Sequence, residues 1–170
     1  MNQKIILVGG TSGVGKSSLS IQMCKEFDIP HKISTGFIRE IVRNITGNKK
    51  LGFYTFDLNQ KNSGYAFLLE QTELLKDSIN VCINRAFKEG TGLVVEGTHV
   101  LPWVINNKYV TDSFILYVED EYKHRKMIEG NTHSKRRKYT NEEFHNVRKI
   151  QEEIIELAVE NNINLKEVYI

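Results

Sequence analysis

Short apolar stretches and longer stretches with helical spacing alternate along the whole chain. Five short stretches predict β-strands, and they are Lys4–Val8, His31–Ser34, Leu93–Val95, Ser113–Val118 and Leu165–Ile170. The first of them is almost entirely apolar, which is typical of a strand buried on both faces of a sheet. It is followed by two glycines, which end the apolar run.

Three of the intervening stretches carry the spacing and the end signals of α-helices. One runs from about Lys16 to Phe27 and stops before Pro30. A longer one runs from about Gly64 to Lys88 and ends before Gly90, with one apolar stripe made of Leu68, Leu75, Ile79, Cys82 and Ala86. The last opens with a capping box at Thr140–Glu143 and breaks at Asn161, and its apolar face is Phe144, Val147, Ile150, Ile154 and Leu157.

Strands separated by helices predict a parallel sheet that is covered by helices on both faces. Ile38, Ile41 and Val42 add helical spacing after the second strand, whereas the polar stretch 44–63 predicts a loop or an irregular insertion. No internal repeat or linker interrupts the 170 residues. We therefore expect a single α/β domain over residues 1–170.

The composition of the chain argues against several classes of protein and of site. Apolar residues make up 40% and charged residues 26% of the chain, which argues against a disordered tail or a fibrous repeat. Cys24 and Cys82 have neither CxxC spacing nor a paired histidine, which argues against a zinc site and favours a reducing, cytoplasmic location. No apolar stretch approaches the roughly 20 residues that span a bilayer, so we expect no membrane partner.

The charge is unevenly distributed. The net charge of +2 is too small to predict nucleic-acid binding. Between Glu121 and Lys149, nine Lys and Arg against four Asp and Glu give a local charge of +5, which leaves −3 for the remainder. A basic segment on a mildly acidic body indicates local binding of an anion, and a solvated basic helix face is the alternative.

The strongest chemical signal lies at residues 10–17. Their sequence, GTSGVGKS, matches the phosphate-binding pattern GxxxxGK[ST] (the P-loop) between a predicted strand and a predicted helix. Glycines let backbone N–H groups turn inward around phosphates, and the helix N-terminus adds its unpaired amides. Lys16 is expected to reach the β- and γ-phosphates, and Ser17 to coordinate Mg²⁺. We expect ATP or GTP to bind at Gly10, Thr11, Ser12, Gly13, Val14, Gly15, Lys16, Ser17 and Ser18.

Two more features extend this hypothesis toward catalysis. Glu96 ends the third predicted strand, where P-loop proteins place the carboxylate that organises Mg²⁺, and a merely exposed acid is the alternative. The stretch 130–139 is basic and has hardly any apolar residue. We expect it to form a lid that brings Arg136 and Arg137 to the transferring phosphoryl group and excludes water. The NKxD guanine signature of switch GTPases is absent, so a small kinase that uses ATP is favoured.

Four stretches together resemble the 2-phosphoglycerate kinase family of small P-loop kinases. They are GGTSGVGKSS (9–18), ISTGFIREIVR (33–43), EGTGLVVEGTHVLP (89–102) and KRRKYTNEEFHNVRKIQEEI (135–154). Many families share the first, whereas STxxIRE combined with VVEGxHxxP is much more specific. The resemblance implies a three-layer α/β/α fold with five parallel strands in the order 2-3-1-4-5. It also implies ATP-dependent phosphorylation of 2-phosphoglycerate to 2,3-bisphosphoglycerate.

One position departs from the family's pattern. Gly36 follows Ser34 and Thr35, where the family often has Asp. In related P-loop kinases an acid near that place accepts the proton of the substrate hydroxyl. Catalysis in this chain then relies on positioning and electrostatics, with the proton leaving late or to Glu96, or else the acceptor or the activity differs.

Candidate acceptor contacts follow the second and third strands. Arg39 and Arg43 are four residues apart, so they share one side of a helix and could grip the phosphate and carboxylate of an anionic acceptor. His99 lies where loops line the ligand crevice of open α/β sheets, although lone histidines are more often structural.

Two alternatives to a kinase of a small phosphorylated acid stay open. One is a kinase of a nucleotide, a nucleic-acid end or another metabolite. The other is a regulatory module that binds a nucleotide without catalysis. The pattern of residues sets no oligomeric state.

Overall fold

The computed structural model describes residues 3–58, 64–130 and 138–169. Its centre is a sheet of five strands, β1 (Ile5–Gly9), β2 (His31–Ser34), β3 (Leu93–Glu96), β4 (Asp112–Tyr117) and β5 (Asn164–Glu167). All neighbouring strands pair in parallel, in the order β2-β3-β1-β4-β5. The predicted fold and strand order are confirmed.

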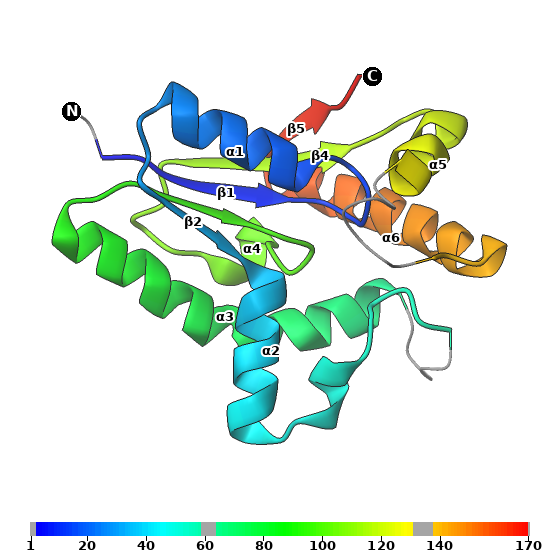
Figure 1. The fold of residues 1–170 in the computed structure, drawn as a ribbon, viewed down its shortest axis with the longest axis horizontal. Coiled ribbons are helices and arrows are strands. Elements are labelled where there is room, and N and C mark those ends of the chain that lie inside the picture. Colours follow the sequence, from blue (N-terminus) through cyan, green and yellow to red (C-terminus); the bar gives the residue numbers. More distant parts are fainter. Residues whose placement is uncertain (1–2, 59–63, 131–137, 170) are drawn as a thin grey trace.

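Helices lie on both sides of this sheet (Figure 1). They are α1 (Lys16–Glu26), α2 (Thr35–Thr46), α3 (Tyr65–Glu89), α4 (Pro102–Ile105), α5 (Glu121–Gly130) and α6 (Asn141–Glu160), together with the 3₁₀ helix η1 (Lys49–Gly52). None of the helices in the described ranges combines the length and the apolarity that crossing a membrane requires.

Successive side chains of β1 point to opposite faces of the sheet, and each face packs against a different layer of helices. Ile5 and Leu7 pack with Leu75 and other residues of α3, whereas Ile6 and Val8 point to the opposite face, toward α1. A further apolar cluster joins α6 to the first turns of α3 and to β4. β1 and β3 are buried on both faces and form the centre of the sheet, and the loops that line the candidate site follow these two strands.

Several local expectations were wrong. The helix α5 was not predicted, because its buried positions are His124 and Ile128 and the rest of its sequence is polar, so no apolar period appears. The polar stretch 44–63 is not wholly irregular, since α2 extends to Thr46 and η1 follows it.

The predicted capping box of α6, by contrast, is confirmed. The Thr140 hydroxyl accepts a hydrogen bond from the backbone N–H of Glu143 at 3.1 Å.

The strand register assembles the functional edge of the sheet. Val8, the last but one residue of β1, and Ser34, at the end of β2, both pair with Glu96 at the end of β3. The carboxyl ends of three neighbouring strands therefore meet, and this is where open α/β sheets place their ligands.

Candidate active site

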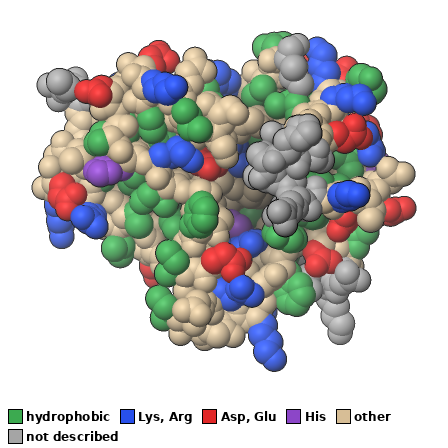
Figure 2. All heavy atoms as spheres, in the orientation of Figure 1, with side chains coloured by type: hydrophobic (Ala, Val, Ile, Leu, Met, Phe, Trp, Pro, Cys, Tyr) green, Lys and Arg blue, Asp and Glu red, His purple; other side chains and the backbone are tan. Residues whose placement is uncertain are grey.

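A pocket of about 290 Å³ lies at this edge. Figure 2, in the orientation of Figure 1, shows the molecular surface hollowed near the middle of this face. Three groups of residues form the walls: the P-loop, the segment from the end of β2 to the turn at 54–56, and the residues that follow β3. The main lining residues are Ser12, Gly13, Gly15, Lys16, Ser17, Ser18, Ser34, Thr35, Gly36, Arg39, Tyr54, Thr55, Phe56, Glu96, Thr98 and His99.

The P-loop glycines adopt a conformation that other residues rarely take. Gly13 and Gly15 have φ of +81° and +84°, and such left-handed turns form concave nests of backbone N–H groups. A Cβ at Gly13 would lie 2.2 Å from Cγ1 of Ile128, so a side chain has no room there. Gly10, Thr11 and Val14 are buried beneath the pocket and do not line it.

Lys16 folds back across the loop. Its ammonium group donates to the backbone carbonyl of Thr11, and the residue is 9% exposed. The Thr11 hydroxyl is buried and has no hydrogen-bond partner among the described residues. A phosphate-sized anion in the loop would give the ammonium group of Lys16 a stronger acceptor than the carbonyl that it contacts now.

Ser17 and Glu96 meet at the floor of the pocket. The Ser17 hydroxyl donates to Oε1 of Glu96 at 3.2 Å, and the ammonium group of Lys32 lies 3.5 Å from the same oxygen. Glu96 itself is only 4% exposed. Lys32 escaped sequence analysis because nothing in a short strand indicates that its side chain reaches the neighbouring strand.

This pair of oxygen donors fits Mg²⁺. A hydroxyl and a carboxylate are the hard ligands that the ion prefers, and protein sites usually supply only one or two of its six positions. Within the described ranges no group of three or more His, Cys, Asp and Glu could hold a metal ion. A bound ion here would therefore take its remaining ligands from nucleotide phosphates and water.

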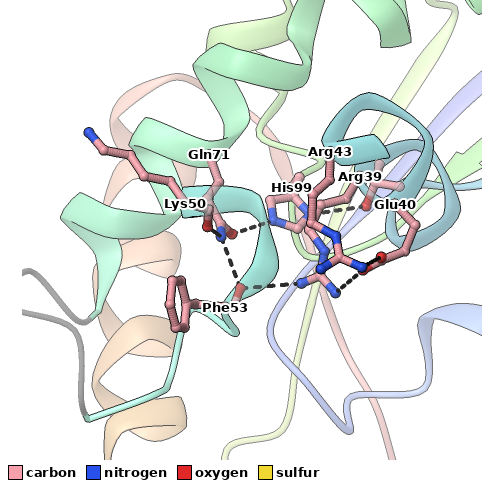
Figure 3. Close-up of polar contacts among 8 residues, drawn as sticks. Arg39, Glu40, Arg43, Lys50, Phe53, Gln71 and His99 are labelled. Carbon is pink, nitrogen blue, oxygen red and sulfur yellow. Dashed lines mark hydrogen bonds and ion pairs between the residues drawn. The ribbon is translucent and has the colours of Figure 1, made fainter. Parts of the chain in front are cut away.

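Arg39 is placed in the pocket, and Arg43 is not. The Arg39 side chain is 12% exposed, donates to the Phe53 carbonyl at 3.4 Å and lies over the ring of Tyr54. Its Nε is buried without a partner among the described residues. Arg39 also pairs with Glu40, at 3.2 Å. Arg43 is half-exposed and forms a 2.6 Å ion pair with the other oxygen of the same carboxylate (Figure 3). The two guanidinium groups therefore share one partner, but only Arg39 lines the pocket.

His99 lines the pocket, but both of its ring nitrogens face protein groups. Nε2 lies 2.8 Å from Oε1 of Gln71, and Nδ1 lies 3.5 Å from the Thr35 hydroxyl. Burial lowers the pKa of His99 to about 3, and the positive charges of Arg39 and Lys16 act in the same direction. The imidazole is therefore neutral at physiological pH and cannot serve as a cationic anchor.

Gln71 was missed as a partner of the site. It lies on α3 between Leu68 and Leu75, two members of the apolar stripe, and it is fully buried. A glutamine on the buried face of an otherwise amphipathic helix is the signal that could have found it, because a buried amide needs hydrogen-bond partners.

Arg136 and Arg137, with most of the expected lid, lie outside the described residues. Arg148 donates to the carbonyls of Val118 and Glu119, at 2.6 and 2.8 Å, so it holds backbone in place. Beside it, Nε2 of the buried His124 donates to the carbonyl of Ser12 at 2.9 Å and ties α5 to the P-loop.

A P-loop, a carboxylate at the end of β3 and this strand order together define the fold of the P-loop kinases. The same fold is seen in a gluconokinase from Sinorhizobium meliloti, 16% identical, with a TM-score of 0.53 over 99% of this chain and 85% of that one. It is also seen in the deoxyadenosine kinase from M. mycoides, 15% identical, with a TM-score of 0.53 over 97% and 90% of the two chains.

The sequence itself is similar to curated kinases with a narrower name, although no protein-family model matches it. The 2-phosphoglycerate kinase of Methanocaldococcus jannaschii is 24% identical over 96% of this chain and 58% of the relative. That of Methanothermobacter thermautotrophicus is 32% identical over 71% of this chain and 45% of the relative. The mevalonate-3-phosphate 5-kinase of Thermoplasma acidophilum is 28% identical over 76% of this chain and 68% of the relative.

These similarities confirm the resemblance to the 2-phosphoglycerate kinases. The chain spans less than two thirds of the length of the two relatives of that name. What those longer proteins do as a whole is therefore a hypothesis for this chain.

Proposed function

We propose that this protein is an ATP-dependent kinase that phosphorylates a hydroxyl group of a small phosphorylated acid. As its acceptor we propose 2-phosphoglycerate, with 2,3-bisphosphoglycerate as the product. The observation that carries this proposal is that the P-loop, Glu96 and Arg39 line one and the same pocket. The pocket joins a triphosphate cradle to a separate, nearly buried cation, which is what transfer between two anionic substrates requires.

On the nucleotide side, the P-loop nest and the N-terminus of α1 bind the phosphates of ATP, and Lys16 turns from the Thr11 carbonyl to the β- and γ-phosphates. Ser17 and Glu96 would hold Mg²⁺, which supplies charge neutralisation to the phosphates when bound. Lys32, on the same oxygen of Glu96 as Ser17, keeps that carboxylate oriented.

In the transfer step, the acceptor hydroxyl oxygen forms a bond to the γ-phosphorus as the bond from that phosphorus to the β,γ-bridging oxygen breaks, and ADP leaves. The hydroxyl proton leaves late, to Glu96 or to water, because a loose transition state makes little demand on a base. This accounts for Gly36 in place of an acid, since Glu96 is the carboxylate that the described residues bring to the pocket.

On the acceptor side, Arg39 binds the acidic end of the acceptor. Its guanidinium is nearly buried, holds one neutral carbonyl and one exposed Glu40, and keeps an unused Nε donor among the described residues. An anion offers such a group a bidentate, charge-assisted pair of hydrogen bonds. From sequence alone, we propose that Arg136 and Arg137 of the 130–139 lid close over the transferring phosphoryl group.

A second acceptor, mevalonate 3-phosphate, is favoured by a specific feature of the pocket. Tyr54, Phe56, Ile128 and Tyr139 add apolar surface to its lining. Such a wall suits an acceptor with more carbon than 2-phosphoglycerate carries. The kinase of Thermoplasma acidophilum that is named for this substrate is one of the relatives above.

A panel of acceptors tests the proposal. ADP release from ATP and Mg²⁺ is measured with 2-phosphoglycerate, 3-phosphoglycerate, glycerate, mevalonate 3-phosphate, gluconate, deoxynucleosides and a 5′-hydroxyl oligonucleotide, and ³¹P NMR identifies the product. We expect the fastest release with 2-phosphoglycerate and a product with two phosphate resonances. Faster ADP release with a nucleoside or an oligonucleotide than with 2-phosphoglycerate would show that the acceptor belongs to that class instead. ATP binding without any acceptor-dependent ADP release would indicate a regulatory module.

A further inference from the structure

A chain of hydrogen bonds runs behind the part of the pocket that we propose binds the acceptor, which we call the acceptor wall (Arg39, His99 and residues 34–36 and 54–56). It links Gln71 on α3, His99 after β3 and Thr35 at the start of α2 to the backbone of residues 50–53 (Figure 3). Gln71 and Thr35 are fully buried, and His99 is 4% exposed. Three separate elements and the backbone of residues 50–53 therefore meet in a network whose three side chains are buried.

The direction of every bond in this network follows from one residue. The side-chain nitrogen of Gln71 lies 2.7 Å from the carbonyl of Lys50 and 2.9 Å from that of Phe53. Carbonyls only accept, so the NH₂ group of Gln71 must face them and its oxygen must face His99. His99 Nε2 then carries the proton, and Nδ1 accepts from the Thr35 hydroxyl. No other arrangement satisfies all the buried groups.

The same turn also holds Arg39. The Phe53 carbonyl accepts from Gln71 and, at 3.4 Å, from Nη1 of Arg39. Thr35 and Arg39 are one helical turn apart at the start of α2. Gln71 thus fixes the arginine through two routes, by way of the turn and by way of His99 and the first residue of α2.

We propose that Gln71 is a positioning residue for acceptor binding. It fixes the tautomer of His99 and the position of the Phe53 carbonyl, and these two groups together hold Arg39 in the pocket. This inference rests on the proposed kinase function. Gln71 itself does not line the pocket, so it acts on the acceptor only through the residues that it orients.

The test compares Gln71→Glu with the wild type in steady-state kinetics, with 2-phosphoglycerate as the acceptor. The variant has nearly the same shape but loses both N–H donors and sets a carboxylate against two carbonyls. We expect the KM for the acceptor to rise about tenfold or more, because the Phe53 carbonyl, which also accepts from Arg39, loses the Gln71 donor that holds it in place. The dissociation constant of ATP, measured by calorimetry, should change less than about twofold.

A matched control is available one residue away. Thr72 is also fully buried on α3, and its hydroxyl has no partner among the described residues. Thr72→Val should leave both constants at their wild-type values. If it raised the acceptor KM as much as Gln71→Glu does, general disturbance of α3 would explain the effect and the proposal would be wrong.

A second measurement needs no variant. ¹⁵N-edited NMR of the wild-type protein should show His99 as the neutral tautomer protonated at Nε2. A proton on Nδ1 would overturn the inference even if Gln71→Glu failed to fold. If Gln71→Glu turned over as fast as the wild type with an unchanged acceptor KM, the positioning role of Gln71 would be wrong and the proposed function would stand. If the wild type itself showed no acceptor-dependent turnover, both the positioning role and the proposed function would be wrong.

Discussion

Two cationic side chains of the described residues line the pocket, and both are held by backbone carbonyls. Lys16 donates to Thr11 of its own loop, and Arg39 donates to Phe53 of a neighbouring turn. A neutral carbonyl keeps such a charge satisfied but is a weaker acceptor than a phosphate or carboxylate. Arg39 also pairs with Glu40 at 3.2 Å, but that carboxylate is 45% exposed, so neither cation is bound to a buried acid among the described residues.

Lys16→Ala should remove the contact with the transferring phosphoryl group and leave a folded protein. We expect acceptor-dependent turnover to fall by about 100-fold or more, the range found when a preorganised charge contact is lost. The measurement is ADP release at saturating acceptor, with circular dichroism as a check of folding. Lys25→Ala, at the exposed end of α1, is the control. Wild-type turnover in Lys16→Ala would remove the kinase assignment.

Arg39→Ala should weaken acceptor binding alone. Loss of charge-assisted hydrogen bonds predicts a rise of about 10- to 100-fold in the acceptor KM, with ATP affinity unchanged. Arg43→Ala, one turn further along α2, removes a half-exposed guanidinium that also pairs with Glu40, and should change neither constant. Reduced ATP affinity in Arg39→Ala with an unchanged acceptor KM would place Arg39 on the nucleotide side.

Among the elements, α2 is attached to the sheet most directly, because β2 ends at Ser34 and α2 begins at Thr35. Its first residue presses on Gly97, just after β3, where φ is +149° and a Cβ would lie 1.8 Å from Oγ1 of Thr35. The backbone N–H of Gly97 also donates to the carbonyl of Val8 in β1. Glycine is required at this position because three elements of the site converge on its backbone.

Gly97→Ala should therefore separate α2 from the sheet. We expect a loss of about 2 kcal/mol or more in the free energy of unfolding, from overpacking added to backbone strain. Gly47→Ala tests the strain alone, because φ is +65° there and the position opens to empty space. It should cost about 1 kcal/mol. Urea unfolding measures both, and equal losses would show that the close approach to Thr35 costs nothing.

At this scale the sequence predicts what local chemistry determines. The P-loop, the cap at Thr140 and the apolar strands depend on residues close together in the chain, so their patterns are visible before folding. The acceptor wall depends on contacts among Thr35, Gln71 and His99, which come from three elements. No spacing rule joins them, and for the same reason the sequence could not show that Arg39 lines the pocket while Arg43 does not.

Across the whole molecule, two buried histidines contact the candidate site, His99 after β3 and His124 on α5, and both are neutral. Burial lowers the pKa of His99 to about 3 and that of His124 to about 4, with positive charges nearby acting in the same direction. One touches the acceptor wall and the other the P-loop, so both halves of the site depend on uncharged imidazoles.

This predicts a loss of stability in mild acid. Below about pH 6.5 the unfolded chain takes up protons on both histidines while the folded chain does not, so the free energy of unfolding falls as pH falls toward 4. Each histidine contributes about 1 kcal/mol per pH unit. Urea unfolding between about pH 7 and pH 5 should show a smaller dependence in His99→Gln and in His124→Gln than in the wild type. His145→Gln, an exposed position on α6, is the control. A slope that neither buried substitution reduces would contradict this account.

Most of the acceptor wall comes from a single segment of the chain. Between β2 and α3, one continuous piece of chain contributes Ser34, Thr35, Gly36, Arg39 and residues 54–56 to the pocket. The phosphate cradle is encoded separately, by residues 12–18. Under the proposed function, substitutions within this one piece would alter most of the contacts to the acceptor and leave the contacts to the triphosphate in place.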